Sequence, residues 1–465
     1  MPKKKTALTI EERLQQALVP AEEQPYEVPE NWVWVRLGNF IDLLRGVSYK
    51  KHDVHNEKME NDCLILRGGN IIEGGLDLNA DNVYVDKSLV SEAQLIRKND
   101  IIIVSSTGSV KVIGRAGLAF YDYNDVAFGA FLTLARPKNG CNKSFVDLFF
   151  QSFLYRQSIR ELASGVNINN IRSEYITNMT FPLPPLSEQQ RIVERIEELF
   201  AKLDEAKERL QEVADSFAVR KAAILHKAFT GELTKQWRRE NGVSDESWEE
   251  KKGEDFFEYV TSGSRGWAKY YSDKGSIFVR MGNLNHGTIE LDFSDIQYVE
   301  LPDQVEGQRS KLQKNDILIS ITADVGMIGL VREDMDAYIN QHVALARPKN
   351  DLYAEFLAWY FVSDVGLQQM QNKQRGATKI GLGLQDIRSI ILKIPTLSEQ
   401  HEIVRLIDDL LARERKAQQA AEQALASIDL MKKSILARAF RGELGTNKAS
   451  EASALELLKQ VLAEN

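Results

Sequence analysis

The strongest constraint on what this chain can fold into is an internal duplication. Three sequence segments recur at a single offset of 211 residues. Segments that repeat at one fixed offset indicate two copies of the same structural unit, so the two halves are expected to share a fold. The three pairs are LSEQQRIV at Leu186 and LSEQHEIV at Leu397, AFTGEL at Ala228 and AFRGEL at Ala439, and LARPKN at Leu134 and Leu345.

Weaker repeats extend the duplication toward the N-terminal end of each half. LRGGNI at Leu66 is similar to VRMGNL at Val279, and KNDIIIVSSTG at Lys98 is similar to KNDILISITAD at Lys314. These offsets are 213 and 216 residues, which indicates short insertions and deletions of the kind that loops tolerate. The two halves are therefore expected to share a framework and to differ in their loops and surfaces.

Each half combines strand patterns with helix patterns. The runs 99–104 and 315–320 are apolar and bounded by polar turns, as strands are, whereas 146–162 and 353–370 carry apolar residues at helical spacing. We predict an α+β fold in which two homologous domains are separated by two long antiparallel coiled-coil helices, with a pseudo-twofold internal repeat. The expected segments are an N-terminal helical segment 1–23, a first domain 24–185, a first spacer helix 186–246, a second domain 247–395, a second spacer helix 396–446 and a C-terminal helical tail 447–465.

The two spacer segments carry the clearest local signal. Ser187 and Gln190 have the spacing of a capping box, and Gly231 and Gly442 stand where a C-cap would end each helix. Apolar residues then alternate in steps of four and three, which is typical of a coiled-coil seam. Two such seams in one chain predict that the helices pack on each other, although Glu414 interrupts the second. The predicted interface residues are Ile192, Ile196, Leu199, Leu203, Leu210, Val213, Phe217, Ile403, Ile407, Leu410, Ile428 and Ile435.

The two ends of the chain resemble each other. The tail that starts at Glu451 and the stretch that starts at Leu8 both have the pattern of short amphipathic helices with paired leucines. If these two helices meet, the pseudo-twofold repeat closes into a ring.

Composition narrows the class of protein. A chain of 465 residues is too long for one hydrophobic core, and its 43% hydrophobic and 27% charged residues are typical of globular proteins. Cys63 and Cys141 fit neither a disulfide framework nor a zinc site, so a reducing cytosolic compartment is expected. No apolar run suits a signal peptide or a membrane span. The formal net charge of −8 argues weakly against a protein coated in nucleic acid but leaves local basic patches open.

The sequence carries no recognisable catalytic signature. It lacks the GxxxxGK[ST] phosphate loop, and it lacks an Asn-Pro-Pro-Tyr or Asp-Pro-Pro-Tyr motif of the amino-methyltransferase type. His52 and His55 form an HxxH pattern without further His or Cys nearby, which is more typical of a loop than of a metal site. We therefore predict a non-catalytic chain that binds no metal and no cofactor of its own.

A resemblance to a known family rests on the repeated motifs. PLPPLSEQQRIV, a heptad helix and AFTGEL, present twice around an α+β domain, resemble the specificity subunit of a type I restriction–modification enzyme along essentially the whole chain. The second copy departs slightly, with Ile-Pro-Thr-Leu where the first has Leu-Pro-Pro-Leu. The resemblance implies two target-recognition domains that each read one half of a split site in double-stranded DNA. It also implies that the helices dock the modification subunits, so that the chain directs both methylation and restriction.

The same resemblance implies partners and their cofactors. Two modification subunits would bind S-adenosylmethionine, and two motor-nuclease restriction subunits would use ATP and Mg. The chain itself would be a non-catalytic subunit in a prokaryotic cytoplasm, with no membrane partner.

Polar residues that recur in both halves are candidates for DNA contacts, because Arg, Lys, Asn and Gln read bases while Ser and Thr bind phosphates. The alternative, that these residues only hold turns, stays open. Base-specific contacts are expected where the halves differ, as at Gln341 and His342, which fall against the Leu132–Thr133 region. The recurring candidates are Arg67 and Asn70 with Arg280 and Asn283; Ser105, Ser106, Thr107 and Lys111 with Thr322; and Asn167 and Arg172 with Thr378 and Lys379.

Two other functions compete with DNA recognition. The first is a coiled-coil protein–protein adaptor with two domains for ligands other than DNA, and the second is a self-contained enzyme with an unrecognised site. A basic groove shared by both domains would favour DNA over the adaptor, and the missing nucleotide and methyltransferase motifs argue against the enzyme. The recognised base sequence does not follow from these residues.

Overall fold

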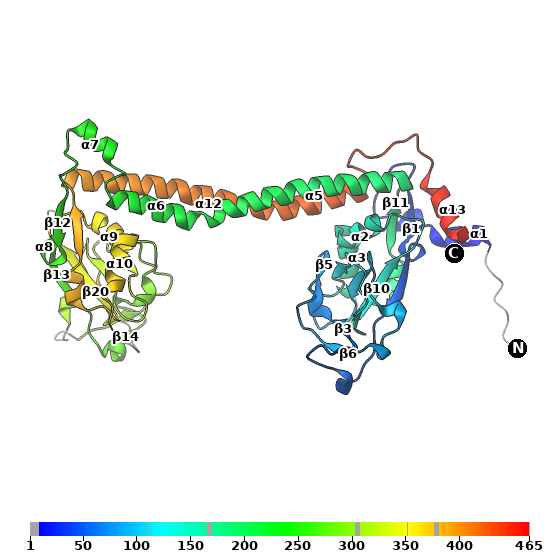
Figure 1. The fold of residues 1–465 in the computed structure, drawn as a ribbon, viewed down its shortest axis with the longest axis horizontal. Coiled ribbons are helices and arrows are strands. Elements are labelled where there is room, and N and C mark those ends of the chain that lie inside the picture. The colour runs from blue at the N-terminus through cyan, green and yellow to red at the C-terminus, as the bar shows by residue number, and fades with distance from the viewer. Residues whose placement is uncertain are drawn as a thin grey trace. The chain divides into compact units, whose positions relative to one another are not determined.

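The computed structural model describes residues 9–109, 111–164, 170–302, 307–350, 352–375 and 381–464. The chain forms two compact units (Figure 1). Unit 1 comprises residues 1–209 and 424–465, and unit 2 comprises residues 210–423. Each of the two long spacer helices therefore contributes one part to unit 1 and the other part to unit 2.

A four-stranded antiparallel sheet, in the order β2–β10–β7–β8, lies at the centre of unit 1. A second sheet, β6–β3–β9, contains the parallel pair β3–β9, in which Leu66 lies opposite Phe128. Two short pairs, β1–β11 and β4–β5, complete the unit. The strands are β1 (Val33–Arg36), β2 (Ile41–Arg45), β3 (Asp62–Leu66), β4 (Ile71–Ile72), β5 (Gly75–Leu76), β6 (Tyr84–Asp86), β7 (Ile101–Val104), β8 (Ala116–Leu118), β9 (Val126–Phe128), β10 (Leu132–Pro137) and β11 (Thr180–Leu183).

Unit 2 repeats this arrangement. Its antiparallel sheet has the order β13–β20–β17–β18, and its second sheet, β14–β16–β15–β19, again contains a parallel pair, in which Val279 lies opposite Ile339. The prediction of two homologous α+β domains is therefore confirmed. The strands are β12 (Glu249–Lys252), β13 (Phe257–Ser262), β14 (Tyr271–Ser272), β15 (Ser276–Val279), β16 (Tyr298–Val299), β17 (Ile317–Ser320), β18 (Ile328–Leu330), β19 (Ala337–Ile339), β20 (Val343–Pro348) and β21 (Ile391–Ile394).

Strand β7 in unit 1 and strand β17 in unit 2 each separate two hydrophobic cores, because successive side chains of a strand point to opposite faces. These two strands are called the central strands below. In unit 1, Ile101 and Ile103 lie in the core that includes the helices, whereas Ile102 and Val104 lie in the core shared with β3 and β9. Strand β17 divides its side chains between two cores in the same way. The helices are α2 (Lys143–Gln151), α3 (Phe153–Ser164) and α4 (Ser173–Thr177) in unit 1, and α7 (Lys235–Asn241), α8 (Gly253–Phe256), α9 (Ala354–Val362), α10 (Asp364–Asn372) and α11 (Leu384–Arg388) in unit 2.

Two repeated motifs hold the central strand in place. The Asn of each KND motif adopts a left-handed backbone, with φ of 69° and 73°, which turns the chain into the strand. The following aspartate is buried and pairs with the arginine of LARPKN: Asp100 with Arg136 at 2.6 Å, and Asp316 with Arg347 at 2.7 Å. These repeated charged residues are therefore part of the framework.

The phenylalanine of each AFxGEL motif joins the end of a long helix to a domain. In unit 1, the ring of Phe440 lies 5.1 Å from that of Phe145 in α2. In unit 2, the ring of Phe229 lies 5.4 Å from that of Phe356 in α9. Each domain is thus held by the beginning of the long helix that follows it and by the end of the other long helix.

The heptad part of the first spacer segment forms two helices, where its pattern predicts one, and the segment also contains the short helix α7. The two helices of the heptad part are α5 (Leu186–Asp215) and α6 (Phe217–Phe229), whereas α12 (Leu397–Phe440) is unbroken. The hydroxyl of Ser216 donates to the carbonyl oxygen of Val213 at 2.7 Å, and a serine that bonds back to a helical carbonyl can bend a helix. Backbone bonds from the N–H of Ser216 to the carbonyl of Glu212 and from the N–H of Arg220 to the carbonyl of Ser216, at 3.1 Å and 3.0 Å, continue across the break, so the interruption is confined to this residue.

The long helices run antiparallel within each unit. In unit 1, Asp204 pairs with Lys432 at 2.5 Å and Lys207 pairs with Asp429 at 3.6 Å. Residue numbers therefore rise along α5 in the direction in which they fall along α12. In unit 2, Arg220 of α6 pairs with Glu414 of α12 at 2.8 Å, and Thr234, just beyond α6, bonds to Glu399 at the start of α12, so the two helices again run in opposite directions. Glu414, which interrupts the apolar spacing of the second seam, therefore forms an ion pair between the two helices.

Burial follows the predicted seam with one exception. Val213 is 43% exposed, whereas Ala214 is half-buried and Phe217 is buried, so the prediction that Val213 lies in the interface is wrong. The stripe continues through Leu210, Ala214 and Phe217 instead. The other predicted positions are buried (Ile192, Ile196, Phe217, Ile403, Ile407 and Ile428) or half-buried (Leu199, Leu203, Leu210, Leu410 and Ile435).

The two ends of the chain meet in unit 1. Helix α1 (Ile10–Ala17) contacts α13 (Ala454–Glu464), as Figure 1 shows. Ala17 from α1 and Leu458 and Val461 from α13 are buried in the same core as the domain helices. The two terminal stretches, which resemble each other in sequence, therefore pack against each other.

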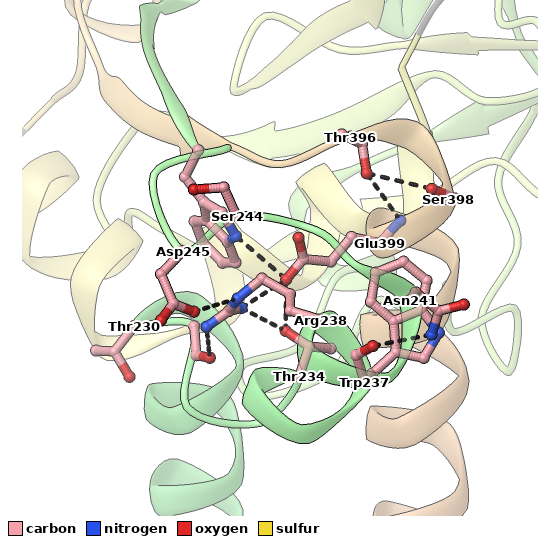
Figure 2. Close-up of polar contacts among 12 residues, drawn as sticks. Thr230, Thr234, Trp237, Arg238, Asn241, Ser244, Asp245, Thr396, Ser398 and Glu399 are labelled. Carbon is pink, nitrogen blue, oxygen red and sulfur yellow. Dashed lines mark hydrogen bonds and ion pairs between the residues drawn. The ribbon is translucent and has the colours of Figure 1, made fainter.

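A buried ion pair joins α7 to the start of α12 in unit 2 (Figure 2). Arg238 donates to Glu399 Oε1 at 2.7 Å, and the hydroxyl of Thr234 donates to the same oxygen at 2.7 Å. Glu399 is 0% exposed and Arg238 is 6% exposed. The equivalent residue of unit 1, Glu188, likewise accepts from an indole N–H, that of Trp32 at 2.8 Å, as Glu399 does from Trp248 at 3.2 Å. Its other side-chain donors are the neutral groups of Thr446 and Asn447. Both halves thus bury a glutamate at the start of a long helix with a tryptophan and a threonine as donors, and unit 2 adds an arginine.

Candidate nucleic-acid interface

An equivalent tight turn leads into the LARPKN strand of each unit. The β9–β10 turn comprises residues 129–131, and the β19–β20 turn comprises residues 340–342. Each turn is closed by a backbone hydrogen bond from the first residue of the next strand to the first residue of the turn, at 2.9 Å in unit 1 and 3.2 Å in unit 2. The two turns therefore occupy the same position in the repeat.

Backbone groups hold the β9–β10 turn of unit 1 from two sides. The N–H of Gly129 donates to the carbonyl of Leu66 at 2.9 Å, and the carbonyl of Phe131 accepts from the N–H of Ser105 at 3.1 Å. Gly46 lies so close that an added Cβ would stand 2.1 Å from the carbonyl oxygen of Gly129. The turn is therefore fixed by its main chain, whatever side chains it carries.

The β19–β20 turn of unit 2 is held by the same contacts. The N–H of Asn340 donates to the carbonyl of Val279 at 3.1 Å, and the carbonyl of His342 accepts from the N–H of Ile321 at 2.9 Å. A Cβ on Gly263 would lie 1.9 Å from the carbonyl oxygen of Ile339. The two units therefore share the backbone of this turn while their side chains differ.

The first predicted cluster divides into exposed arginines and buried asparagines. Asn70 is 0% exposed and accepts from the N–H of Arg67 at 2.8 Å, and Asn283 is 4% exposed and accepts from the N–H of Arg280 at 2.9 Å. Both amides also donate to backbone carbonyls, so they stabilise turns and do not face DNA, contrary to the prediction. The guanidinium groups of Arg67 and Arg280 are partly exposed.

The second cluster follows the central strand of each sheet. Ser105 is 4% exposed and its hydroxyl donates to the carbonyl of Phe131 at 3.0 Å, so it holds the β9–β10 turn and is not available to DNA as predicted. Ser106 and Thr107 are partly exposed, and Lys111 is exposed. In unit 2, Thr322 is partly exposed. These exposed and partly exposed side chains remain candidates for phosphate contacts.

The third cluster adjoins the second in both units. Ser106 forms a β-bridge with Asn170, and Thr322 forms one with Gly381. Arg172 is exposed at the start of α4, two residues beyond the bridge of unit 1. The other predicted members, Asn167, Thr378 and Lys379, lie outside the residues that the structure describes.

A cavity lies beside the turn in each unit. In unit 1 it measures about 600 Å³, and Arg67, Thr107 and Phe131 lie on its wall with several aliphatic side chains. In unit 2 a cavity of about 630 Å³ is lined by polar and cationic side chains that include Arg265 and Gln341. Equivalent backbone positions therefore border an apolar surface in one unit and a polar, cationic surface in the other.

The acidic, histidine and cysteine side chains of the described part of the chain do not gather into a metal centre. Within those residues, no three His, Cys, Asp or Glu side chains are grouped so that they could hold a metal ion. His55 of the HxxH pattern instead pairs with the buried Asp62 at 2.9 Å. Cys63 is buried, and burial raises the pKa of its thiol to about 11. None of the described helices is long and apolar enough to cross a membrane.

Comparison with known proteins decides the family. The sequence model of the type I restriction modification DNA specificity domain matches residues 29–215 and, a second time, residues 245–423. The chain belongs to the type I restriction–modification specificity family. It is 31% identical to the EcoKI specificity subunit of Escherichia coli K12, across 94% of this chain and 96% of that subunit.

Further members and solved structures support the assignment. The StySPI specificity subunit of Salmonella potsdam is 28% identical across 94% of this chain and 96% of its own. The HsdS subunit of Thermoanaerobacter tengcongensis has the same fold, with a TM-score of 0.61, 18% identity, and coverage of 91% of this chain and 100% of that one. This chain accordingly supplies DNA sequence specificity as a non-catalytic subunit of a type I system, and the adaptor alternative is not favoured.

Sequence reasoning missed the side chain that most distinguishes the two turns of this specificity subunit. Gln341 and His342 are equivalent to Ala130 and Phe131, and they do not match the Leu132–Thr133 region with which the sequence analysis compared them. The 211-residue offset of LARPKN, applied to the residues just before that motif, pairs His342 with Phe131. That offset is the signal that could have found Phe131.

Proposed function

We propose that each unit of this specificity subunit reads one half of a bipartite target in double-stranded DNA. The observation that supports the proposal is the pair of turns with one shared backbone frame and different side chains. Contacts to phosphates position a protein on DNA without regard to sequence, whereas contacts to base edges distinguish sequences. A repeated domain that reads two different half-sites therefore needs a common frame with side chains that differ at the base contacts.

The proposed contacts follow this division. Partly exposed or exposed residues around the turns would contact phosphates, and Gln341 and His342 would contact bases in the half-site of unit 2. Glutamine suits an adenine in the major groove, because its amide can donate to N7 and accept from the N6 amino group. The proposed phosphate contacts are Arg67, Ser106, Thr107, Lys111 and Arg172 in unit 1 and Arg280 and Thr322 in unit 2, joined on sequence grounds by Asn167, Thr378 and Lys379.

The long helices would serve as the docking surface for two modification subunits. S-adenosylmethionine would then bind to those subunits, and ATP and Mg would bind to two restriction subunits, in a prokaryotic cytoplasm. The exposed side chains on α5, α6 and α12 support this part of the proposal, since polar helix faces that no described segment covers are suited to protein partners.

A domain exchange tests independent reading. Residues 24–185 would be replaced by the corresponding domain of a relative that has a different target, and the methylated site would be mapped in cells that also carry the modification subunits. We expect one half of the site to change and the other half to stay the same. The reciprocal exchange of residues 247–395 is the matched control and should change the opposite half. A change in both halves after either exchange would contradict independent reading.

A further inference from the structure

The two equivalent turns present side chains of opposite chemistry. Phe131 is 71% exposed, which is unusual for a phenylalanine, and it occupies the position that His342 holds in unit 2. His342 and its neighbour Gln341 are partly buried, and their side-chain nitrogens lie 2.8 Å apart. The shared frame thus carries an apolar ring in unit 1 and a hydrogen-bonding pair in unit 2.

The backbone of Phe131 is held unusually well for a residue with an exposed ring. Its carbonyl oxygen accepts from the N–H groups of Ser105 and Ser106, at 3.1 Å and 3.0 Å, and from the hydroxyl of Ser105 at 3.0 Å. These bonds do not involve the ring, so the fold does not need an aromatic side chain at this position. The frame presents the ring to the surface in a fixed place.

The surroundings of the ring suit DNA. The cavity beside Phe131 also has Arg67, Thr107 and Asp81 on its wall, and Arg67 pairs with Asp81 at 3.0 Å. The guanidinium of Arg67 stays 47% exposed, so it and the hydroxyl of Thr107 are suited to phosphate contacts. Phe153 is 61% exposed as well, but its cavity is lined by residues of α3 and the end of α12 and belongs to a different surface of unit 1. Phe120 is 55% exposed too, but it does not line the cavity that holds Arg67 and Thr107, whereas Phe131 does.

We propose that Phe131 determines specificity by contacting the 5-methyl group of a thymine in the half-site that unit 1 reads. Thymine alone presents a methyl group in the major groove, and phenylalanine is one of the side chains that contact it. The inference rests on the proposed function of unit 1 and adds the chemistry of one contact. The equivalent position in unit 2 would read a hydrogen-bonding base edge through Gln341 and His342.

Deoxyuridine tests the proposal because it differs from thymidine by this methyl group alone. The assembled complex of the full chain with its modification subunits would be titrated with duplexes that carry the mapped target. Each thymine of the unit 1 half-site would be replaced in turn by deoxyuridine. We expect one replacement to weaken binding roughly fourfold, the ratio that corresponds to burying one methyl-sized group. Phe131→Ala should bind the two duplexes equally, and Phe153→Ala should still prefer thymine.

The outcomes separate the inference from the function on which it rests. Specific binding without any difference between thymine and deoxyuridine in that half-site would overturn the role of Phe131 alone. The role of Phe131 would also be overturned if the half-site contained no thymine on either strand. It would be overturned likewise if Phe131→Ala still bound the thymine duplex more tightly than the deoxyuridine duplex. A wild-type complex that binds no target specifically would overturn the proposed function and this inference with it. The comparison of thymine with deoxyuridine in the wild-type complex tests the proposal even if the Phe131→Ala variant assembles poorly.

Discussion

Replacing Arg238 with methionine should destabilise unit 2, because it removes the guanidinium from a buried carboxylate. In the wild-type chain Arg238 donates to Glu399 at 2.7 Å, to Asp245 at 2.9 Å and to the carbonyl of Gly231 at 2.8 Å. Glu399 would keep only neutral donors, which are the hydroxyl of Thr234 at 2.7 Å and the indole N–H of Trp248 at 3.2 Å. Its Oε2 already lacks a hydrogen-bond donor among the described residues.

The size of the effect follows from the burial of the pair. Removing one partner of a buried ion pair costs about 3–5 kcal/mol, because the other charge stays buried without compensation. The two neutral donors that remain on Glu399 place the expected loss near the lower end, about 3 kcal/mol. In a unit of this size each kcal/mol lowers Tm by about 2–4 °C, so the unfolding transition of unit 2 should fall by about 6–12 °C.

Two further variants make the test specific. Arg191 of unit 1 also binds a carboxylate, Glu451, through two bonds of 2.8 Å, but these side chains are 25% and 21% exposed. Arg191→Met should therefore cost only about 1 kcal/mol, as expected for a pair that water reaches. Combining Arg238→Met with Glu399→Leu should recover most of the loss, since an apolar pair leaves no buried charge.

Thermal unfolding of the full chain measures the three variants, and hydrogen exchange assigns the transition to the segment around α7 and the start of α12. The reasoning would be refuted if Arg238→Met shifted Tm no more than Arg191→Met. It would also be refuted if the double variant were as unstable as the single one.

Two other predictions concern unit 1 and the long helices. Burial raises the pKa of Asp147 from 3.8 to about 7, so the folded state binds a proton that the unfolded state releases, and stability should fall as pH rises from about 4 to about 7. In Asp147→Asn the midpoint of urea unfolding should depend less on pH, and the free energy of unfolding at pH 8 should rise by up to about 4 kcal/mol. A pH profile identical to that of the wild-type chain would contradict this. Leu203→Asp places a charge in the half-buried seam and should abolish assembly with the modification subunits on a sizing column, while both domains stay folded. Val213→Asp, at an exposed position, is the matched control and should assemble normally, so equal behaviour of the two variants would count against the seam.

The sequence was sufficient to predict the fold class because repetition and periodicity are both visible in it. The 211-residue offset required two similar domains, and the heptad spacing required long helices that pack together. The break at Ser216 was not predictable in the same way. The apolar spacing runs through it without interruption, and only the folded chain shows where α5 ends and α6 begins.

The candidate site was predicted only in part, and the errors share a cause. Residues that recur in both halves include those that maintain the common frame, and Asn70, Asn283 and Ser105 proved to be of this kind. The partners of the two buried glutamates also escaped prediction. The equivalent donors are Trp32 and Trp248, which both stand eight residues before a buried phenylalanine, but only the folded chain shows that their indoles bond to Glu188 and Glu399. Arg238 adds a charged donor in unit 2 alone among these contacts of the described residues.

If the turns read DNA as proposed, the shared frame would let one domain architecture acquire different specificities. The bonds that hold the two turns run between backbone N–H and carbonyl groups, and they therefore stay in place when the side chains of the turn change. Substitutions on an exposed surface usually alter stability by no more than about 0.5 kcal/mol, so a ring can replace a hydrogen-bonding pair at little cost to the fold. The close approach of Gly46 and Gly263 to the turns marks the opposite case, because any side chain at those glycines would displace the backbone of the turn. Divergence in what the two units read is thus expected at residues 130–131 and 341–342, and constancy is expected at the glycines beside them.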